Sequence, residues 1–244
     1  MANPYFRFKQ FTVFQDKCAM KVSTDACIFG AWMAGIFAEQ VSGEGRILDI
    51  GAGTGLLGLM IAQRCDAFIT GVELQEESAL QAASNMVSSP WSDRLRVVPG
   101  DINDLVFTEP FDAIITNPPF FENDLLSEEH GRSLARHGET LTHSQVLRVF
   151  FLDLTAHGIA GILLPYHRME SFLEEASILG FRCREQVLLR QTPDHDFFRA
   201  MLLMEREILE EAYAPPLVKE WAIREGEQYG SECLSLLKDY YLYL

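Results

Sequence analysis

The sequence predicts an α/β fold in which a mostly parallel sheet carries helices on both faces and ends in an antiparallel hairpin. Apolar runs of strand length alternate with amphipathic stretches from Arg46 onwards. A glycine-rich loop follows the first of these runs, and two longer apolar runs flank a polar turn at Thr192–Asp196. Repeated strand–helix units give parallel strands buried between helices, whereas a short polar turn joins an antiparallel pair.

The elements of the core follow in order along the chain. Strands are expected at Arg46–Gly51, Ala67–Glu73, Leu95–Gly100, Phe111–Asn117, Gly158–Pro165, Phe181–Gln191 and Phe197–Glu207. Helices are expected at Gly55–Arg64, Glu76–Val87, Thr142–Ala156 and His167–Leu179, and Gly180 stops the last of them.

The rest of the chain is arranged around that core in one expected domain, residues 1–244. In the N-terminal extension, residues 1–45, alternation over Phe6–Phe8 and Phe11–Val13 predicts a small strand pair. We expect a catalytic core at 46–207, a hydrophilic insertion between Phe121 and Thr142, and a helical C-terminal segment at 208–244 with a docked helix in Leu217–Tyr243.

Composition excludes several classes of protein. Hydrophobic residues make up 48% of the 244, yet no apolar run approaches the length of about 18 residues that a membrane helix needs. The N-terminus lacks an apolar leader, and the five cysteines and the histidines show no disulfide or metal spacing, so we expect a cytoplasmic protein without metal. A net charge of −15 disfavours nonspecific nucleic-acid binding, although a local basic face remains open.

The loop "LDIGAGTGLLG", residues 48–58, follows a strand and opens a helix, which is where doubly wound sheets bind nucleotides. Gly51, Gly53 and Gly55 allow the backbone to approach a ligand closely. The spacing is G-x-G-x-G. The G-x-G-x-x-G fingerprint of dinucleotide sites would need a third glycine at position 56, where this chain has Leu56. Asp49 would repel a pyrophosphate but suits an ammonium group.

This loop resembles motif I of the class I S-adenosylmethionine (SAM) methyltransferases. That resemblance implies a Rossmann-like, mostly parallel seven-stranded sheet with an antiparallel C-terminal hairpin, and SAM as the cofactor. It also implies that Glu73 accepts the ribose hydroxyls and that Asp101 meets the adenine amino group. Asp49, Gly51, Gly53 and Gly55 are the expected contacts from the loop itself.

The motif "NPPF", Asn117–Phe120, ends the fourth strand and resembles that of enzymes that methylate planar exocyclic nitrogens. The lone pair of such a nitrogen is conjugated and poorly nucleophilic. The Asn117 side-chain oxygen and the Pro118 carbonyl can accept its two N–H groups and aim its lone pair at the methyl group. Pro119 stiffens the loop, and Phe120 offers a stacking face, worth about 1–3 kcal/mol per base. We expect these four residues to be catalytic.

Residues 6–32, "FRFKQFTVFQDKCAMKVSTDACIFGAW", resemble bacterial tRNA adenine-N6 methyltransferases that modify the adenine just 3′ of the anticodon in valine tRNA. "ARH", Ala135–His137, and the C-terminal "LLKDYYLYL" match too, so the resemblance covers essentially the whole chain. It implies tRNA as the substrate and Lys21, Thr24 and Asp25 as further cofactor contacts.

RNA contacts are expected from two places. The N-terminal stretch interleaves aromatic residues with Arg7 and Lys9, and the insertion places Arg132, Arg136 and His137 beside the target pocket. Both sets are also compatible with a strand covering the core and with a solvated loop. We expect a monomer without membrane contact.

Three other functions stay open from the sequence. A guanine-N2 or protein-glutamine N5 methyltransferase would use the same Asn-Pro-Pro chemistry, and only residues 6–32 favour adenine. Leu56 argues against a dinucleotide-dependent oxidoreductase. The intact Asn117–Phe120 motif argues against a non-catalytic SAM-binding or RNA-binding module.

Overall fold

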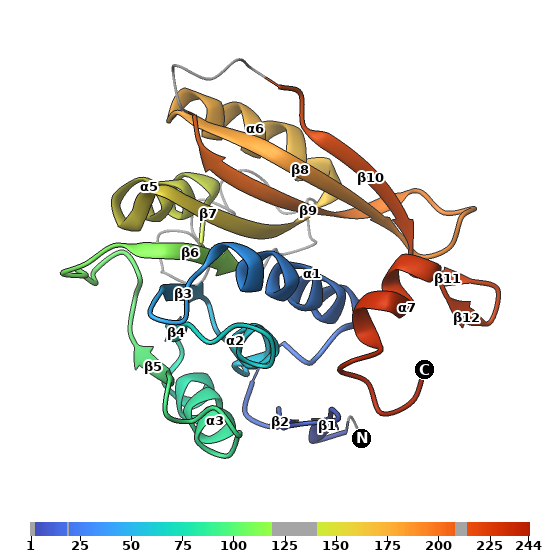
Figure 1. Ribbon diagram of the computed structural model, residues 1–244, viewed down its shortest axis with the longest axis horizontal. Helices are drawn as coiled ribbons and strands as arrows, with labels where there is room; N and C mark the ends of the chain where they lie inside the picture. Colours follow the sequence, from blue (N-terminus) through green and yellow to red (C-terminus); the bar gives the residue numbers. More distant parts are fainter. Residues whose placement is uncertain (1–2, 19, 119–140, 208–213) are drawn as a thin grey trace, which may run out of the picture.

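A computed structural model describes residues 3–18, 20–118, 141–207 and 214–244. Its centre is one sheet of eight strands in the order β10-β8-β9-β7-β6-β3-β4-β5, and β9 runs antiparallel to its neighbours (Figure 1). The strands are β3 (Arg46–Ile50), β4 (Phe68–Glu73), β5 (Leu95–Pro99), β6 (Phe111–Thr116), β7 (Leu154–Pro165), β8 (Phe181–Arg190), β9 (Phe197–Arg206) and β10 (Leu217–Ala222). The predicted fold class is confirmed.

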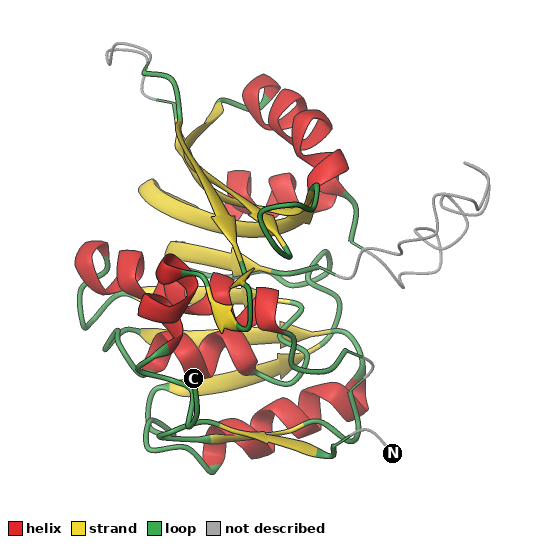
Figure 2. Ribbon diagram, turned by 90° about the vertical axis from the view of Figure 1, so that its right-hand side faces the viewer, coloured by secondary structure: helices red, strands yellow, loops and turns green. Residues whose placement is uncertain are grey.

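Helices cover both faces of this sheet, as Figures 1 and 2 show. The first face carries α1 (Thr24–Gln40), α2 (Leu56–Ala62), α3 (Glu76–Val87) and α7 (Ser231–Leu237), and the second carries α5 (His143–Asp153) and α6 (Met169–Ile178) after the short 3₁₀ helix η1 (Tyr166–Arg168). Strand residues alternate between the two cores: Met201 and Leu203 of β9 pack with the first, whereas Leu202 packs with the second. Both faces of the sheet are therefore buried in apolar cores.

Most predicted boundaries agree with the structure to within one or two residues. Helix α3 matches the prediction, and Gly180 follows α6 with a φ of 76°, the left-handed conformation expected of a residue that ends a helix. Strand β7 begins at Leu154, four residues earlier than predicted, because α5 ends at Asp153. Thr142 caps α5 through a reciprocal capping box with Gln145.

Two elements differ from the sequence analysis. Helix α1 fills seventeen residues of the N-terminal extension, where no helix was predicted. Leu217–Ala222 was expected to be helical but forms β10, which pairs in parallel with β8 and adds an eighth strand. Helix in the C-terminal segment is limited to α7 among the described residues, after the hairpin β11 (Arg224–Glu225) and β12 (Gln228–Tyr229).

The predicted N-terminal strand pair exists as β1 (Tyr5–Arg7) and β2 (Thr12–Phe14). Asn85 of α3 fastens it to the core, since its side-chain Nδ2 donates to the carbonyls of Phe14 at 2.8 Å and Thr54 at 2.9 Å, and its Oδ1 accepts from the Phe14 N–H at 3.0 Å. Asn85 is 1% exposed. One buried amide thus joins β2, α3 and the glycine loop.

No helix among the described residues is both long and apolar enough to span a bilayer.

We predict that Asn85→Ala lowers the free energy of unfolding by at least about 2 kcal/mol. The variant leaves the Phe14 N–H and the carbonyls of Phe14 and Thr54 without their hydrogen-bond partner in the folded protein. Urea denaturation measures the loss. The control is Ser84→Ala on the exposed side of the same helix, which should stay within about 0.5 kcal/mol of the unaltered protein. Equal stabilities for the two variants would show that Asn85 does not fasten the strand pair.

Candidate active site

The expected site residues lie where parallel strands end at one edge of the sheet. Ile50, the last residue of β3, pairs with Val72 of β4 on one side and with Thr116 of β6 on the other. The residues that follow these three positions, Gly51, Glu73 and Asn117, therefore emerge at the same level. Neighbouring strands are about 4.8 Å apart, so three different strands contribute to one small region.

The glycine loop has the open shape that its sequence predicts. Gly51, Gly53 and Gly55 have φ values of 72°, 56° and 79°, which favour glycine. The amides of Gly51 and Ala52 both donate to the Val72 carbonyl, at 2.9 and 3.0 Å, which holds the loop against β4. A Cβ at Gly51 would meet no heavy atom within 4 Å, so the backbone there faces open space that a ligand can enter.

Asp49 is completely buried beneath this loop. Its Oδ2 accepts from the Gly58 N–H at 3.3 Å, and its Oδ1 has no partner among the described residues. Burial raises the pKa of the Asp49 carboxyl from 3.8 to about 7, the Gly58 bond opposes that rise, and the negative charge of Glu73 adds to it. A cationic ligand above the loop would favour the ionised form.

Glu73 joins the glycine loop to the end of β4. Its Oε2 accepts from the Gly53 N–H at 2.8 Å and its Oε1 from the Gln75 N–H at 2.9 Å. Each carboxylate oxygen has a further lone pair, which can accept a ligand hydroxyl. The Glu73 carbonyl accepts in turn from the Gly100 N–H at 2.9 Å, so the ends of β4 and β5 are tied together.

Asp101 follows β5 at this edge and is half-buried. Its Oδ1 accepts from the backbone and side-chain nitrogens of Asn103, at 2.9 and 2.8 Å, which fixes the carboxylate and leaves Oδ2 for a ligand. Acceptors at Glu73 and Asp101, an orphaned carboxylate oxygen at Asp49 and an open glycine backbone suit a ligand with a ribose, an amino-bearing base and a positive charge. The residues present therefore fit the expected SAM.

The first of the three further expected cofactor contacts is Lys21. Its Nζ donates to the carbonyls of Gln15 and, at 3.3 Å, of Cys18. The Cys18 side chain hydrogen-bonds to Ser78 of α3 and lies within electrostatic range of Glu73, which places Cys18 near the end of β4. Neither Cys18 nor Ser78 was predicted to lie here, and no motif in the sequence marks either residue.

Thr24 and Asp25 contact other parts of the protein. Thr24 hydrogen-bonds to Tyr241 near the C-terminus. Asp25 Oδ2 accepts from Arg199 Nε of β9 at 3.0 Å, and both side chains are largely buried. These contacts anchor the start of α1, and a role of the two residues in cofactor binding stays a prediction.

Asn117 is half-buried and Pro118 is buried at the end of β6. The neighbouring Thr116 hydroxyl donates to the Ile50 carbonyl at 2.9 Å, which locks this strand end against β3. No described residue bonds to the Asn117 side chain, so its amide is available to a substrate. Pro119, Phe120, Arg132, Arg136 and His137 lie outside the described residues.

The expected basic RNA contacts at the N-terminus have different surroundings. Arg7 is exposed on β1, beside the exposed ring pair Tyr5 and Phe14, whose centroids are 6.1 Å apart. Lys9 instead holds the C-terminal tail: its N–H donates to the Tyr240 carbonyl at 2.8 Å and its Nζ to the Lys238 carbonyl at 2.5 Å. Lys9 thus has a structural role that its charge did not reveal.

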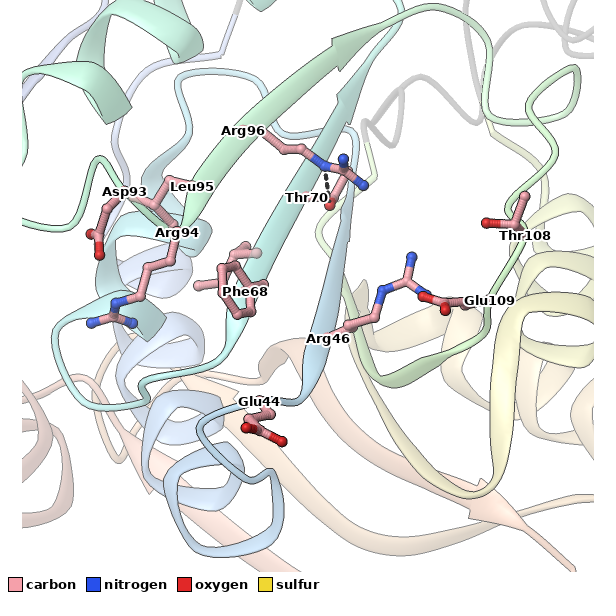
Figure 3. A pocket seen from close by; sticks show the side chains of 11 residues that line it. Glu44, Arg46, Phe68, Thr70, Asp93, Arg94, Leu95, Arg96, Thr108 and Glu109 are labelled. Carbon is pink, nitrogen blue, oxygen red and sulfur yellow. Dashed lines mark hydrogen bonds and ion pairs between the residues drawn. The ribbon is translucent and has the colours of Figure 1, made fainter.

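A separate pocket of about 500 Å³ lies at the opposite edge, where β3, β4 and β5 begin (Figure 3). Its arginines are engaged. Arg46 pairs with Glu109 at 2.9 Å and Arg96 Nε donates to Thr70 at 2.9 Å, and Arg94 donates to two carbonyls at the end of α2. It lies away from the glycine loop.

Among the described residues no cluster of His, Cys, Asp and Glu could hold a metal ion.

Comparisons with known proteins point the same way as this geometry. The model of the methyltransferase small domain family matches residues 33–145. The tRNA1(Val) (adenine(37)-N6)-methyltransferase of Dyadobacter fermentans is 39% identical, with 98% of each chain covered, and that of Bacteroides thetaiotaomicron is 39% identical over both full lengths. A predicted O-methyltransferase from Agrobacterium tumefaciens shares the fold, with a TM-score of 0.62, 19% identity and coverage of 88% of this chain and 96% of that one.

We predict that Glu73→Ala weakens SAM binding at least about tenfold, since charge-assisted hydrogen bonds are worth roughly 1.5–3 kcal/mol. Calorimetric titration gives the affinity. Glu76→Gln removes one negative charge from an exposed position at the start of α3 and is the matched control, with unchanged affinity expected. If Glu73→Ala binds SAM as tightly as the control does, Glu73 does not hold the ribose.

A second prediction concerns the pH dependence of stability. The pKa of Asp49 is higher in the folded state, about 7, than its unfolded value near 3.8, so the folded protein keeps a proton that the unfolded chain releases. Asp49 therefore costs stability increasingly as pH rises from about 4 to about 7. Asn at this position cannot ionise, so the stability of Asp49→Asn relative to the unaltered protein should rise over that range in urea melts. A pH-independent difference would contradict the raised pKa.

Proposed function

This chain belongs to the family of the tRNA1(Val) (adenine(37)-N6)-methyltransferases, and we propose that the edge carrying Gly51, Glu73 and Asn117 is its active site. The enzyme transfers a methyl group from SAM to the exocyclic N6 of an adenine in tRNA. We propose the adenine just 3′ of the anticodon in valine tRNA as the target. The shared level of Ile50, Val72 and Thr116 is the observation that supports the site, because it brings the cofactor loop beside Asn117.

On the cofactor side, the chain's own groups would hold SAM in one orientation. Glu73 would accept the ribose hydroxyls, the free oxygen of Asp101 would accept from the adenine amino group, and the ionised Asp49 would favour the positive end of the ligand. SAM, when bound, supplies an electrophilic methyl group. The protein contributes mainly position, which is worth much of the barrier in a reaction between two held groups.

On the substrate side, the Asn117 side-chain oxygen and the Pro118 carbonyl would accept the two N–H groups of the target amine. This draws the nitrogen towards tetrahedral geometry and frees its lone pair for the methyl carbon. Asparagine is not a strong base, so the proton leaves after transfer, when the nitrogen is cationic. Phe120, outside the described residues, would stack on the base.

We predict that Asn117→Ala lowers kcat at least about 100-fold while the affinity for SAM stays nearly unchanged, because the lost acceptor matters most as the amine pyramidalises. Single-turnover methyl transfer to a valine tRNA transcript measures the rate. Asn117→Asp, which keeps an oxygen acceptor at the same place, should retain more activity than the alanine variant.

Two outcomes would change this assignment. Near-normal turnover by Asn117→Ala would leave the motif a structural turn only. Efficient methylation of a transcript with guanine at the target position would keep the chemistry but move the enzyme to guanine-N2 specificity.

A further inference from the structure

The carboxyl edge of the sheet continues past Asn117, away from the cofactor loop. Thr116 of β6 pairs with Ile162 of β7, so the end of β7 extends beyond Asn117 on the neighbouring strand. Pro165 of β7 pairs with Arg199 of β9, and Phe197 of β9 pairs with Arg190 of β8. The chain segments at this edge therefore follow one another from Asn117 to β7, β9 and β8.

Three side chains at these strand ends form an aromatic rim, defined here as Tyr166, Phe197 and Arg190. The ring centroids of Tyr166 and Phe197 are 5.4 Å apart, and the Arg190 guanidinium lies 5.4 Å from the centroid of the Phe197 ring. Tyr166 is 37% exposed, and Phe197 packs partly against the second core. The Phe197 ring is thus anchored in the second core, while the Tyr166 ring stays partly exposed.

Charged residues of both signs lie around the rim, and the basic residues His167 and Arg168 directly follow Tyr166. Arg190 lies 3.7 Å from Glu220, and Asp194 and Asp196 occupy the turn between β8 and β9. A net charge of −15 disfavours the attraction of phosphates to the protein as a whole. Flat rings with an arginine beside them are instead suited to stacking on unpaired bases, which tolerates any base because every base has a π face.

We propose that this aromatic rim binds the unpaired nucleotides that flank the target adenine in the anticodon loop of tRNA. The proposal rests on the proposed function. Asn117 can reach the N6 atom only if the target base leaves its stack, which exposes a face of the adjoining base. Tyr166 follows β7, the neighbour of β6, and Phe197 begins β9, the next strand along, so their rings offer that base a new stacking partner.

The test compares Tyr166→Ala and Phe197→Leu with Phe151→Ala. Phe151 is a matched control because it is also an exposed ring with an arginine, Arg206, 5.4 Å from its centroid, but it lies at the end of α5 that leads into the start of β7, at the opposite edge of the sheet. We expect the KM for the tRNA transcript to rise at least about fivefold in both rim variants and to stay unchanged in the control, with kcat and the affinity for S-adenosylhomocysteine kept.

A direct readout of stacking separates this role from a structural one. An anticodon stem-loop with 2-aminopurine beside the target should lose fluorescence on binding to the unaltered enzyme. With each protein at a concentration that saturates the stem-loop, Tyr166→Phe should keep that quenching and Tyr166→Ala should lose it, because only the aromatic ring can stack on the base. Thermal melts establish that each variant is folded.

The outcomes distinguish the two proposals. If the unaltered enzyme fails to methylate the transcript, the proposed function itself is wrong. If it methylates normally but both folded rim variants match Phe151→Ala in KM and in quenching, the rim does not bind RNA. If Phe197→Leu fails to fold, Tyr166→Ala, at the more exposed position, decides alone.

Discussion

The pairing of Ile50 with Val72 on one side and with Thr116 on the other is the constraint on which the site depends. Because side chains alternate along a strand, a slip of one residue between β3 and either neighbour would turn every side chain to the wrong face. The contact between Glu73 and the Gly53 amide and the bond from the Thr116 hydroxyl to the Ile50 carbonyl both require this register. The geometry of the site thus follows from the alignment of β3, β4 and β6 in the core.

The acidic character of the chain is compatible with a site that has two halves, one for the cofactor and one for the substrate. The cofactor half gathers Asp49, Glu73 and Asp101, which suit a ligand that carries positive charge and donates hydrogen bonds. The proposed substrate half, at the ends of β7, β8 and β9, carries rings and arginines paired with acids. The ion pair between Asp25 and Arg199 joins the start of α1 to this second half without leaving net charge. Such an enzyme would recognise RNA by shape and stacking more than by attraction to the phosphate backbone.

The sequence predicted most of the core because its strands are short apolar runs and its helices are amphipathic. Helix α1 escaped prediction because its residues from Ala26 to Ala34 are buried on all sides, which removes the periodicity that marks a helix. Strand β10 escaped because it is an edge strand whose first residues, Leu217 and Val218, are more than half exposed. The positions of the motif residues at strand ends were predictable from the apolar runs before them, whereas the roles of Asn85 and Lys9 arise from contacts distant in sequence.

Helix α1, which the sequence did not reveal, and the residues before it connect several parts of the candidate site. Methylation of a conjugated amine needs no strong base from the protein, so its rate depends on how closely the acceptors and the methyl donor are held. Helix α1 brings Asp25 to β9, and Cys18, which precedes this helix, meets Ser78 near the end of β4. Asn85 then joins β2 to the glycine loop. The N-terminal residues therefore connect both halves of the edge. These contacts constrain their sequence even at positions that touch neither cofactor nor RNA.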